Sequence, residues 1–132
     1  MISAVLSAVL LLCASTPVWA AENSMDNFKS VQKYEIPFSD VPSSNWAASS
    51  VKTCYEYRLM NGVSATDFRP KGSLTVAEAL AMACRVHQIY SEGRCTLENG
   101  SPLWYQPYID YALSQGIIAS SDFKDYTATI TR

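Results

Sequence analysis

The sequence predicts an all-α protein built from tandem helix–loop–helix repeats with long connecting loops. Three observations support this fold class. Apolar side chains recur at helical spacing in three stretches, glycine and proline interrupt the chain between them, and the first stretch is repeated later in the chain. Helices are therefore expected near residues 45–60, 75–91 and 104–115, with no sheet of consequence.

The first predicted helix runs from about Asn45 to Met60. Asn61 and Gly62 follow it and tolerate the positive φ that a helix end often requires, so the helix is expected to stop there. Its apolar stripe consists of side chains spaced by three and four residues on one face, which are Val51, Cys54 and Tyr55.

The second predicted helix begins after a non-helical loop. Pro70 fixes its own φ and pushes Arg69 toward an extended conformation, so residues 63–73 are not expected to be helical. Thr75 and Glu78 have the spacing of a capping box, in which each side chain binds a backbone N–H of the first turn. The helix that follows is apolar around most of its circumference and is expected to need cover on several sides.

The third predicted helix repeats the first at an offset of 58 residues, which indicates an internal repeat. Gly116 is expected to end it. Residues 130–132 then correspond to residues 74–76, where the second helix begins, so the matching helix of the second repeat is missing from this sequence. The aligned pairs are Trp104 with Trp46, Ile109 with Val51, and Ala112 with Cys54.

The N-terminal segment, residues 1–20, is predicted to be a secretory signal peptide. Its apolar run from Ile2 to Leu12 is too short, at about 11 residues, to span a bilayer comfortably. Val18 and Ala20 supply small or modest side chains before the expected cleavage point. Residues 21–37 are polar and lack periodicity, so they are interpreted as a linker or an extended lead-in.

The charge balance points away from nucleic acid and anionic membranes as partners. Without the signal peptide, about 112 residues carry all 10 basic and all 12 acidic side chains, and no basic stripe is present. No membrane span is expected after signal cleavage.

Five short motifs follow one another between residues 38 and 78: Phe38-Ser-Asp-Val-Pro42, Trp46-Ala47, Asn61-Gly62, Phe68-Arg-Pro70 and Leu74-Thr-Val-Ala-Glu78. Their order resembles one repeat of the S-layer homology (SLH) family. The last motif fits four of five positions of the family's Ile-Thr-Arg-Ala-Glu, with Val76 where the family has arginine. Ile130-Thr-Arg132 resembles a truncated second copy. The resemblance divides the chain into repeat one at 38–92, a connection at 93–103 and a partial repeat two at 104–132.

The resemblance implies a function. SLH modules hold secreted bacterial proteins noncovalently on secondary cell-wall polysaccharide, often on pyruvylated sugar, usually as three tandem copies. The implied location is secreted, at the cell wall or S-layer, with further repeats beyond this sequence and no cofactor. The implied carbohydrate-binding residues are Asp40, Trp46, Asn61, Gly62, Thr75, Glu78, Trp104, Thr131 and Arg132.

Several of these residues have two interpretations. Trp46 and Trp104 would either stack on sugar rings or anchor the helix starts in the core. Arg132 would pair with a carboxylate or remain a solvated side chain. Glu78 and Asp40 would contact sugar or serve as a cap and a turn residue. The helix start at Thr75 is expected to offer backbone N–H groups to an anionic sugar substituent.

Other function classes find less support in the sequence. His87 is the single histidine, and Cys54, Cys84 and Cys95 are scattered, so a zinc site is not expected. The three thiols permit one disulfide with three possible pairings, although buried free thiols at Cys54 and Cys84 are slightly favoured. No nucleophile elbow or phosphate loop indicates an enzyme. A protein-binding or assembly module of the cell envelope, using exposed tyrosines, and a small secreted hydrolase remain the alternatives. The tyrosines are Tyr105, Tyr108 and Tyr111.

Overall fold

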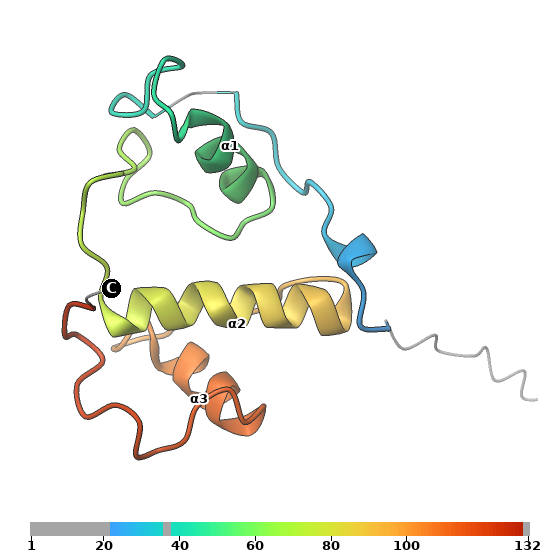
Figure 1. Ribbon diagram of the computed structural model, residues 1–132. Helices are drawn as coiled ribbons and strands as arrows, with labels where there is room; N and C mark the ends of the chain where they lie inside the picture. Colours follow the sequence, from blue (N-terminus) through green and yellow to red (C-terminus); the bar gives the residue numbers. More distant parts are fainter. Residues whose placement is uncertain (1–21, 36–37, 131–132) are drawn as a thin grey trace, which may run out of the picture.

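A computed structural model describes residues 22–35 and 38–130. The predicted signal peptide, Thr131 and Arg132 lie outside the described residues. Within the described ranges regular structure is helical, which confirms the all-α class, and strand-type pairing is limited to one bridge between Thr75 and Thr129. The elements are a 3₁₀ turn η1 (Met25–Asn27) and the helices α1 (Ala48–Glu56), α2 (Val76–Glu92) and α3 (Gln106–Ser114) (Figure 1).

Helices α1 and α3 have the same local geometry. The bounds of α3 are those of α1 shifted by 58 residues at both ends. Each helix ends with the residue after its C-cap in the left-handed region, at φ 55° for Arg58 and 66° for Gly116. In both, the next backbone N–H bonds back to the carbonyl oxygen five residues earlier at 2.8 Å, the bond that defines a Schellman motif.

The predicted bounds of the first helix were too wide. Asn45 lies outside α1, because its side-chain oxygen accepts a hydrogen bond from the Ala47 backbone N–H at 2.9 Å. The Schellman motif at Arg58 ends the helix several residues before Met60. The positive φ of Gly62, 78°, belongs to the following loop, where an added Cβ would come within 2.6 Å of the Phe38 ring.

Helix α2 begins with the predicted capping box. The Glu78 backbone N–H donates to Thr75 Oγ1 at 3.3 Å, and the Thr75 N–H donates to Glu78 Oε2 at 2.7 Å. The helix ends at Gly93, which has φ 73° and donates its N–H to the Ile89 oxygen. Cover by the described residues is less complete than expected, because an apolar stripe of Ala83, Val86 and Tyr90 stays exposed.

The apolar side chains form two separate clusters. The α2–α3 core lies between these two helices, which pack directly against each other. The α1 core is closed by aromatic loop residues, because α1 contacts no other helix in the described part of the chain. The α2–α3 core consists of Leu80, Ala81, Cys84, Tyr108, Ile109 and Ala112, and the α1 core of Phe38, Val41 and Val51 with Tyr34, Tyr55 and Phe68 around them.

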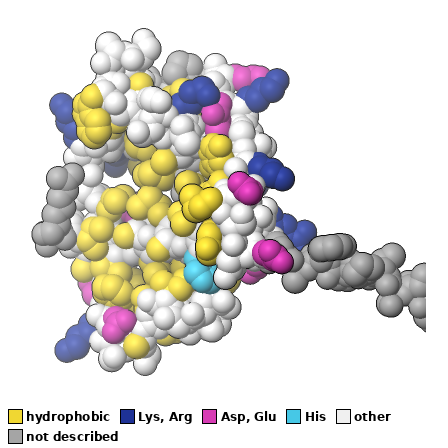
Figure 2. Space-filling view, turned by 45° about the vertical axis from the view of Figure 1, so that its right-hand side comes forward, with side chains coloured by type: hydrophobic (Ala, Val, Ile, Leu, Met, Phe, Trp, Pro, Cys, Tyr) yellow, Lys and Arg dark blue, Asp and Glu magenta, His cyan; other side chains and the backbone are white. Residues whose placement is uncertain are grey.

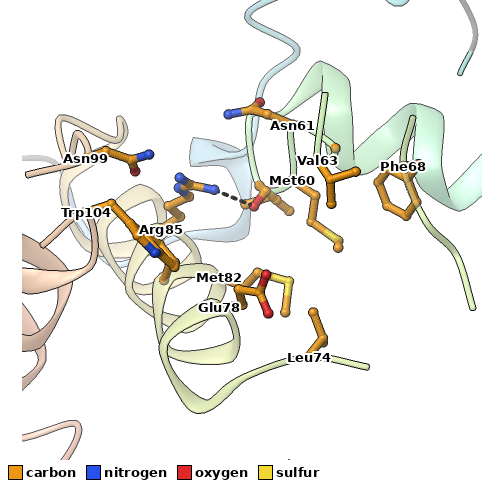
Figure 3. A pocket seen from close by; sticks show the side chains of 13 residues that line it. Met60, Asn61, Val63, Phe68, Leu74, Glu78, Met82, Arg85, Asn99 and Trp104 are labelled. Carbon is orange, nitrogen blue, oxygen red and sulfur yellow. Dashed lines mark hydrogen bonds between the residues drawn. The ribbon is translucent and has the colours of Figure 1, made fainter. Parts of the chain in front are cut away.

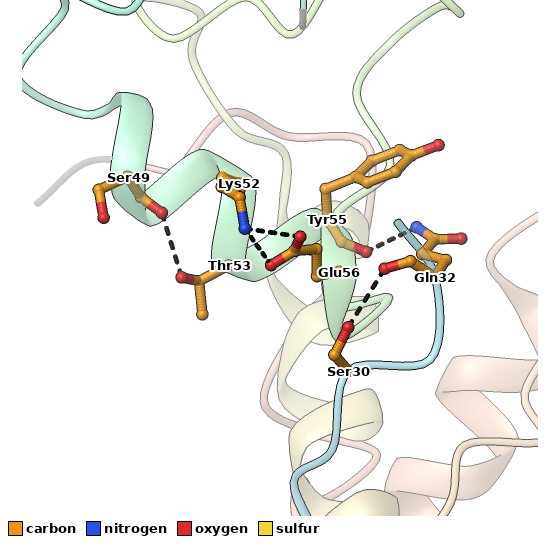
Figure 4. Close-up of polar contacts among 7 residues, drawn as sticks. All are labelled: Ser30, Gln32, Ser49, Lys52, Thr53, Tyr55 and Glu56. Atoms are coloured by element: carbon orange, nitrogen blue, oxygen red, sulfur yellow. Dashed lines mark hydrogen bonds and ion pairs between the residues drawn. The ribbon is translucent and has the colours of Figure 1, made fainter. Parts of the chain in front are cut away.

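The described part of the lead-in, residues 22–35, binds to both halves of the molecule. Backbone N–H groups of Val31 and Gln32 donate to the Glu56 oxygen, and the Gln32 side-chain amide donates to the Tyr55 oxygen at 2.6 Å (Figure 4). Near η1, the Asn27 amide donates to the Tyr90 oxygen at 2.7 Å. The lead-in therefore connects the end of α1 to the end of α2.

Candidate functional site

A groove of about 440 Å³ lies between the two cores. Its walls come from three segments: the loop at 59–74 between α1 and α2, one face of α2, and the chain before α3 (Figure 3). The first two segments come from the part of the chain up to the end of α2, whereas Asn99 and Trp104 follow α2. The groove is therefore located between the α1 loop region and the chain that leads into α3.

Arg85 is held at the centre of this groove. Its Nη1 donates to the Leu59 oxygen at 3.1 Å and its Nη2 donates to the Tyr108 hydroxyl at 2.7 Å. The guanidinium carbon lies 5.2 Å from the centroid of the Tyr108 ring, a cation–π contact. Tyr108 in turn donates its hydroxyl hydrogen to Asn99 Oδ1 at 3.1 Å. Among the described lining residues Arg85 is the one lysine or arginine, so it sets the positive charge of the groove.

Trp104 supplies an aromatic surface beside Arg85. Its ring makes edge contacts with Tyr105 and Tyr108, at centroid distances of 5.5 and 6.2 Å, and remains 36% exposed. The Trp104 ring is thus partly packed against the core and partly open to a ligand, so it combines features of the core-anchor and the sugar-stacking interpretation. Figure 2 shows hydrophobic side chains gathered across the middle of one face of the molecule, next to His87.

Four of the predicted carbohydrate-binding residues line the groove: Asn61, Gly62, Glu78 and Trp104. Glu78 is nevertheless engaged as a cap, since its Oε2 accepts hydrogen bonds from both the backbone N–H and the hydroxyl of Thr75. The capping interpretation of Glu78 is confirmed. Of the predicted binding residues, the groove therefore offers two side chains that can contact a ligand, the amide of Asn61 and the indole ring of Trp104.

Asp40 and Trp46 lie away from the groove. The Asp40 carboxylate accepts hydrogen bonds from the backbone N–H groups of Phe68 and Arg69, at 2.9 and 2.6 Å, so it ties the segment before α1 to the loop before α2. Trp46 is 93% exposed. The core-anchor interpretation is therefore wrong for Trp46.

The start of α2 does not offer its backbone to a ligand. The Val76 N–H donates to the Ala128 oxygen at 2.9 Å and the Ala77 N–H to the Tyr126 oxygen at 2.8 Å. The Glu78 N–H is bound by Thr75. The expectation of an anion site on these N–H groups is wrong, because a segment about 50 residues later in the chain occupies them.

Sequence reasoning missed Arg85 and Asn99. A signal for Arg85 exists, because it stands seven residues after Glu78 and hence on the same face of a mostly apolar helix. Asn99 has no such signal. Its place depends on the Tyr108 hydroxyl, which belongs to another element.

Two loop carboxylates are stabilised in their ionised form. Asp67 lies in the loop next to the groove. Hydrogen bonds from the hydroxyls of Ser64 and Thr66 lower the pKa of its carboxyl group. Asp125 accepts hydrogen bonds from the hydroxyl and the backbone N–H of Thr127, and these lower its pKa as well.

The three cysteines in the described part of the chain are free thiols. Cys84 is fully buried, as expected, and donates its S–H to the backbone carbonyl oxygen of Tyr108 at 3.3 Å. Cys54 and Cys95 are half-buried. Burial raises the pKa of Cys54. Within the described residues no cluster of three metal-binding side chains occurs, and no helix there has the length and apolarity of a membrane span.

Comparison with known proteins gives a family match over α1 and the start of α2. Residues 37–80 match the S-layer homology domain. The chain is 28% identical over 106 residues to the surface-layer 125 kDa protein of Lysinibacillus sphaericus, covering 74% of this chain and 9% of that protein. It is 40% identical over 50 residues to an endoglucanase of Bacillus sp. (strain KSM-635), covering 38% of this chain and 5% of the endoglucanase. No solved structure matches the chain.

The chain spans less than a tenth of the length of these relatives. The family match ends at residue 80, inside α2, so Arg85, Asn99 and Trp104 lie beyond it. S-layer homology domains anchor proteins to the cell wall, at the cell surface. The sequence motifs and the family match agree that residues 37–80 are an S-layer homology domain.

Proposed function

We propose that this chain holds a secreted protein noncovalently on the cell surface by binding secondary cell-wall polysaccharide in the groove between the two cores. The observation that carries the proposal is the combination of Trp104, Arg85 and two asparagine side chains in one groove. An indole ring suits the apolar C–H face of a sugar, and amides suit its hydroxyl groups. The proposed role is binding and not catalysis.

Arg85 is suited to an acidic sugar substituent such as a pyruvyl group. A guanidinium has five N–H donors, and the protein engages one on Nη1 and one on Nη2. Donors therefore remain for a carboxylate, and the planar group can bind it in bidentate fashion. Because the Leu59 oxygen and the Tyr108 hydroxyl already fix the guanidinium, little side-chain entropy is lost when ligand binds.

A protein-binding or assembly role is the second candidate, and the exposure of Trp46 favours it. This side chain is 93% exposed, and Met25 and Val31 are also exposed, at 72% and 65%. Large exposed apolar side chains are enriched in contact surfaces between proteins. The two candidates use different tryptophans, which makes them separable by mutation.

The test is cosedimentation of the purified chain with cell walls, before and after chemical removal of the secondary polysaccharide. We expect Trp104→Ala to weaken sedimentation with intact walls on the order of tenfold, and Trp46→Ala to leave it unchanged. Retention on stripped walls, or loss of binding only in Trp46→Ala, would favour the assembly role over the groove.

A further inference from the structure

The loop after α2 brings a second cysteine, Cys95, back along the face of α2 that carries Cys84. The side chain of Gln88, which is 5% exposed, accepts a hydrogen bond from the Thr96 backbone N–H at 2.8 Å and donates one to the Thr96 hydroxyl at 2.9 Å. Gln88 follows Cys84 by four residues, so both project from the same face of α2. Cys95 precedes Thr96 directly, so the backbone that carries it runs back along this face of α2.

The third thiol is in a different environment. Cys54 lies on α1, which contacts neither α2 nor α3 in the described part of the chain. Cys84 belongs to the α2–α3 core, and Leu97, two residues after Cys95, packs against the same core. Of the three pairings that the sequence permits, the geometry therefore favours Cys84 with Cys95.

The thiols of Cys84 and Cys95 also differ in reactivity, because one is fully buried and the other is half-buried. Burial raises the pKa of Cys84 to about 11, with a further contribution from the neighbouring Cys95. Cys95 is half-buried and can be reached from solution. A solution oxidant should therefore react first at Cys95.

We propose that Cys84 and Cys95 form an intramolecular disulfide when the protein meets a low-molecular-weight disulfide such as oxidised glutathione. The Cys95 thiolate attacks one sulfur of the reagent, which forms a mixed disulfide and releases one glutathione thiolate. Cys84 then loses its proton and attacks the Cys95 sulfur, which releases the second glutathione. The protein loses two protons and two electrons, and the reagent gains them as two thiols.

The bond would act on the connection between α2 and α3. It closes a ring of about 12 residues, from 84 to 95, and fixes the start of the chain that carries Asn99 and Trp104 into the groove. Between Gly93 and Gln106 no described residue belongs to a helix, so this stretch is held by individual hydrogen bonds such as those of Thr96 and Asn99. The inference goes beyond the proposed function and does not depend on it.

The test is oxidation of the folded, fully reduced chain with glutathione disulfide, followed by mass spectrometry of the intact protein and its peptides. We expect a loss of two hydrogens without a glutathione adduct, and a crosslinked peptide pair containing residues 84 and 95. Cys54→Ser should give the same result, and Cys95→Ser should abolish the crosslink. A crosslink that includes Cys54, or a stable glutathione adduct on Cys95, would overturn the pairing.

Thermal unfolding gives an independent readout. Oxidation should raise the melting midpoint of the unaltered chain and of Cys54→Ser by at least about 5 °C, because the ring restricts the unfolded state. Cys95→Ser should show no such shift, and since Cys95 is only half-buried this variant is expected to fold. If the reduced and the oxidised protein had the same melting midpoint, the native fold would not accommodate a disulfide between Cys84 and Cys95, and the proposal would be contradicted.

Discussion

Helices α1 and α3 have the same length, begin at positions 58 residues apart and both end in a Schellman motif, yet they lie in different surroundings. Figure 1 shows α2 lying between them. α3 packs on α2, whereas α1 is covered by loops. The clearest difference in sequence is at one position, where α3 has the buried Tyr108 and α1 has the exposed Ser50. Local sequence therefore sets where a helix begins and ends, while individual side chains decide what it packs against.

The largest effect should come from the position that separates the two helices. Tyr108 is 1% exposed and bonds to Arg85 and Asn99, so Tyr108→Ala should lower the free energy of unfolding by about 3–5 kcal/mol. The matched change Ser50→Ala should alter it by less than about 0.5 kcal/mol. Urea unfolding of both variants would measure the contrast. Similar losses would mean that the two helices are not packed as differently as described.

A smaller effect should appear at the helix ends. Gly116→Ala should cost about 1 kcal/mol, because φ is 66° there while an added Cβ would meet no atom within 4 Å. Arg58→Gly at the equivalent position should stabilise the protein by up to about 1 kcal/mol. Among the described residues, the Arg58 side chain makes an exposed 3.8 Å ion pair with Glu98, which contributes little to stability. Thermal unfolding midpoints that move in the same direction for both variants would refute the shared motif.

The smallest effect should be on the acid side of the pH profile. The folded-state pKa of Asp67 lies below its ordinary value of 3.8, so the hydrogen-bonded carboxylate contributes stability above that value. This contribution is lost as the pH falls through the folded pKa. Asp67→Asn should therefore lose less stability than the unaltered chain when the pH falls from neutral to acid. Urea unfolding midpoints measured at each pH would show this difference. An identical acid dependence would show that the loop hydroxyls do not hold the carboxylate.

The features that could be predicted from the sequence are those that depend on neighbours in the chain. Thr75 and Glu78 are three residues apart, and the capping box forms as expected. The end of α1 was predicted wrongly, because Arg58 adopts a left-handed conformation that its residue type does not favour. Gly116 at the equivalent place signalled its helix end directly.

The candidate site was harder to predict because it is assembled from distant segments. The N–H groups at the start of α2 were expected to be free, but residues 126–128 occupy them. Arg85 takes its place through bonds to Leu59 and Tyr108, each more than 20 residues away in the chain. Contacts at that separation carry no periodic signal in a single sequence.

The proposed ligand site is the groove between the two cores, and Arg85 is its most specific part. Calorimetric titration should compare Arg85→Lys with the unaltered chain, using isolated polysaccharide with and without its acidic substituents. We predict that Arg85→Lys weakens binding of the acidic polymer on the order of tenfold, because lysine cannot bind a carboxylate in bidentate fashion. Binding of the neutral polymer should change much less. Equal losses for both polymers would mean that Arg85 supports the fold alone, and unchanged binding of the acidic polymer would place the ligand outside the groove.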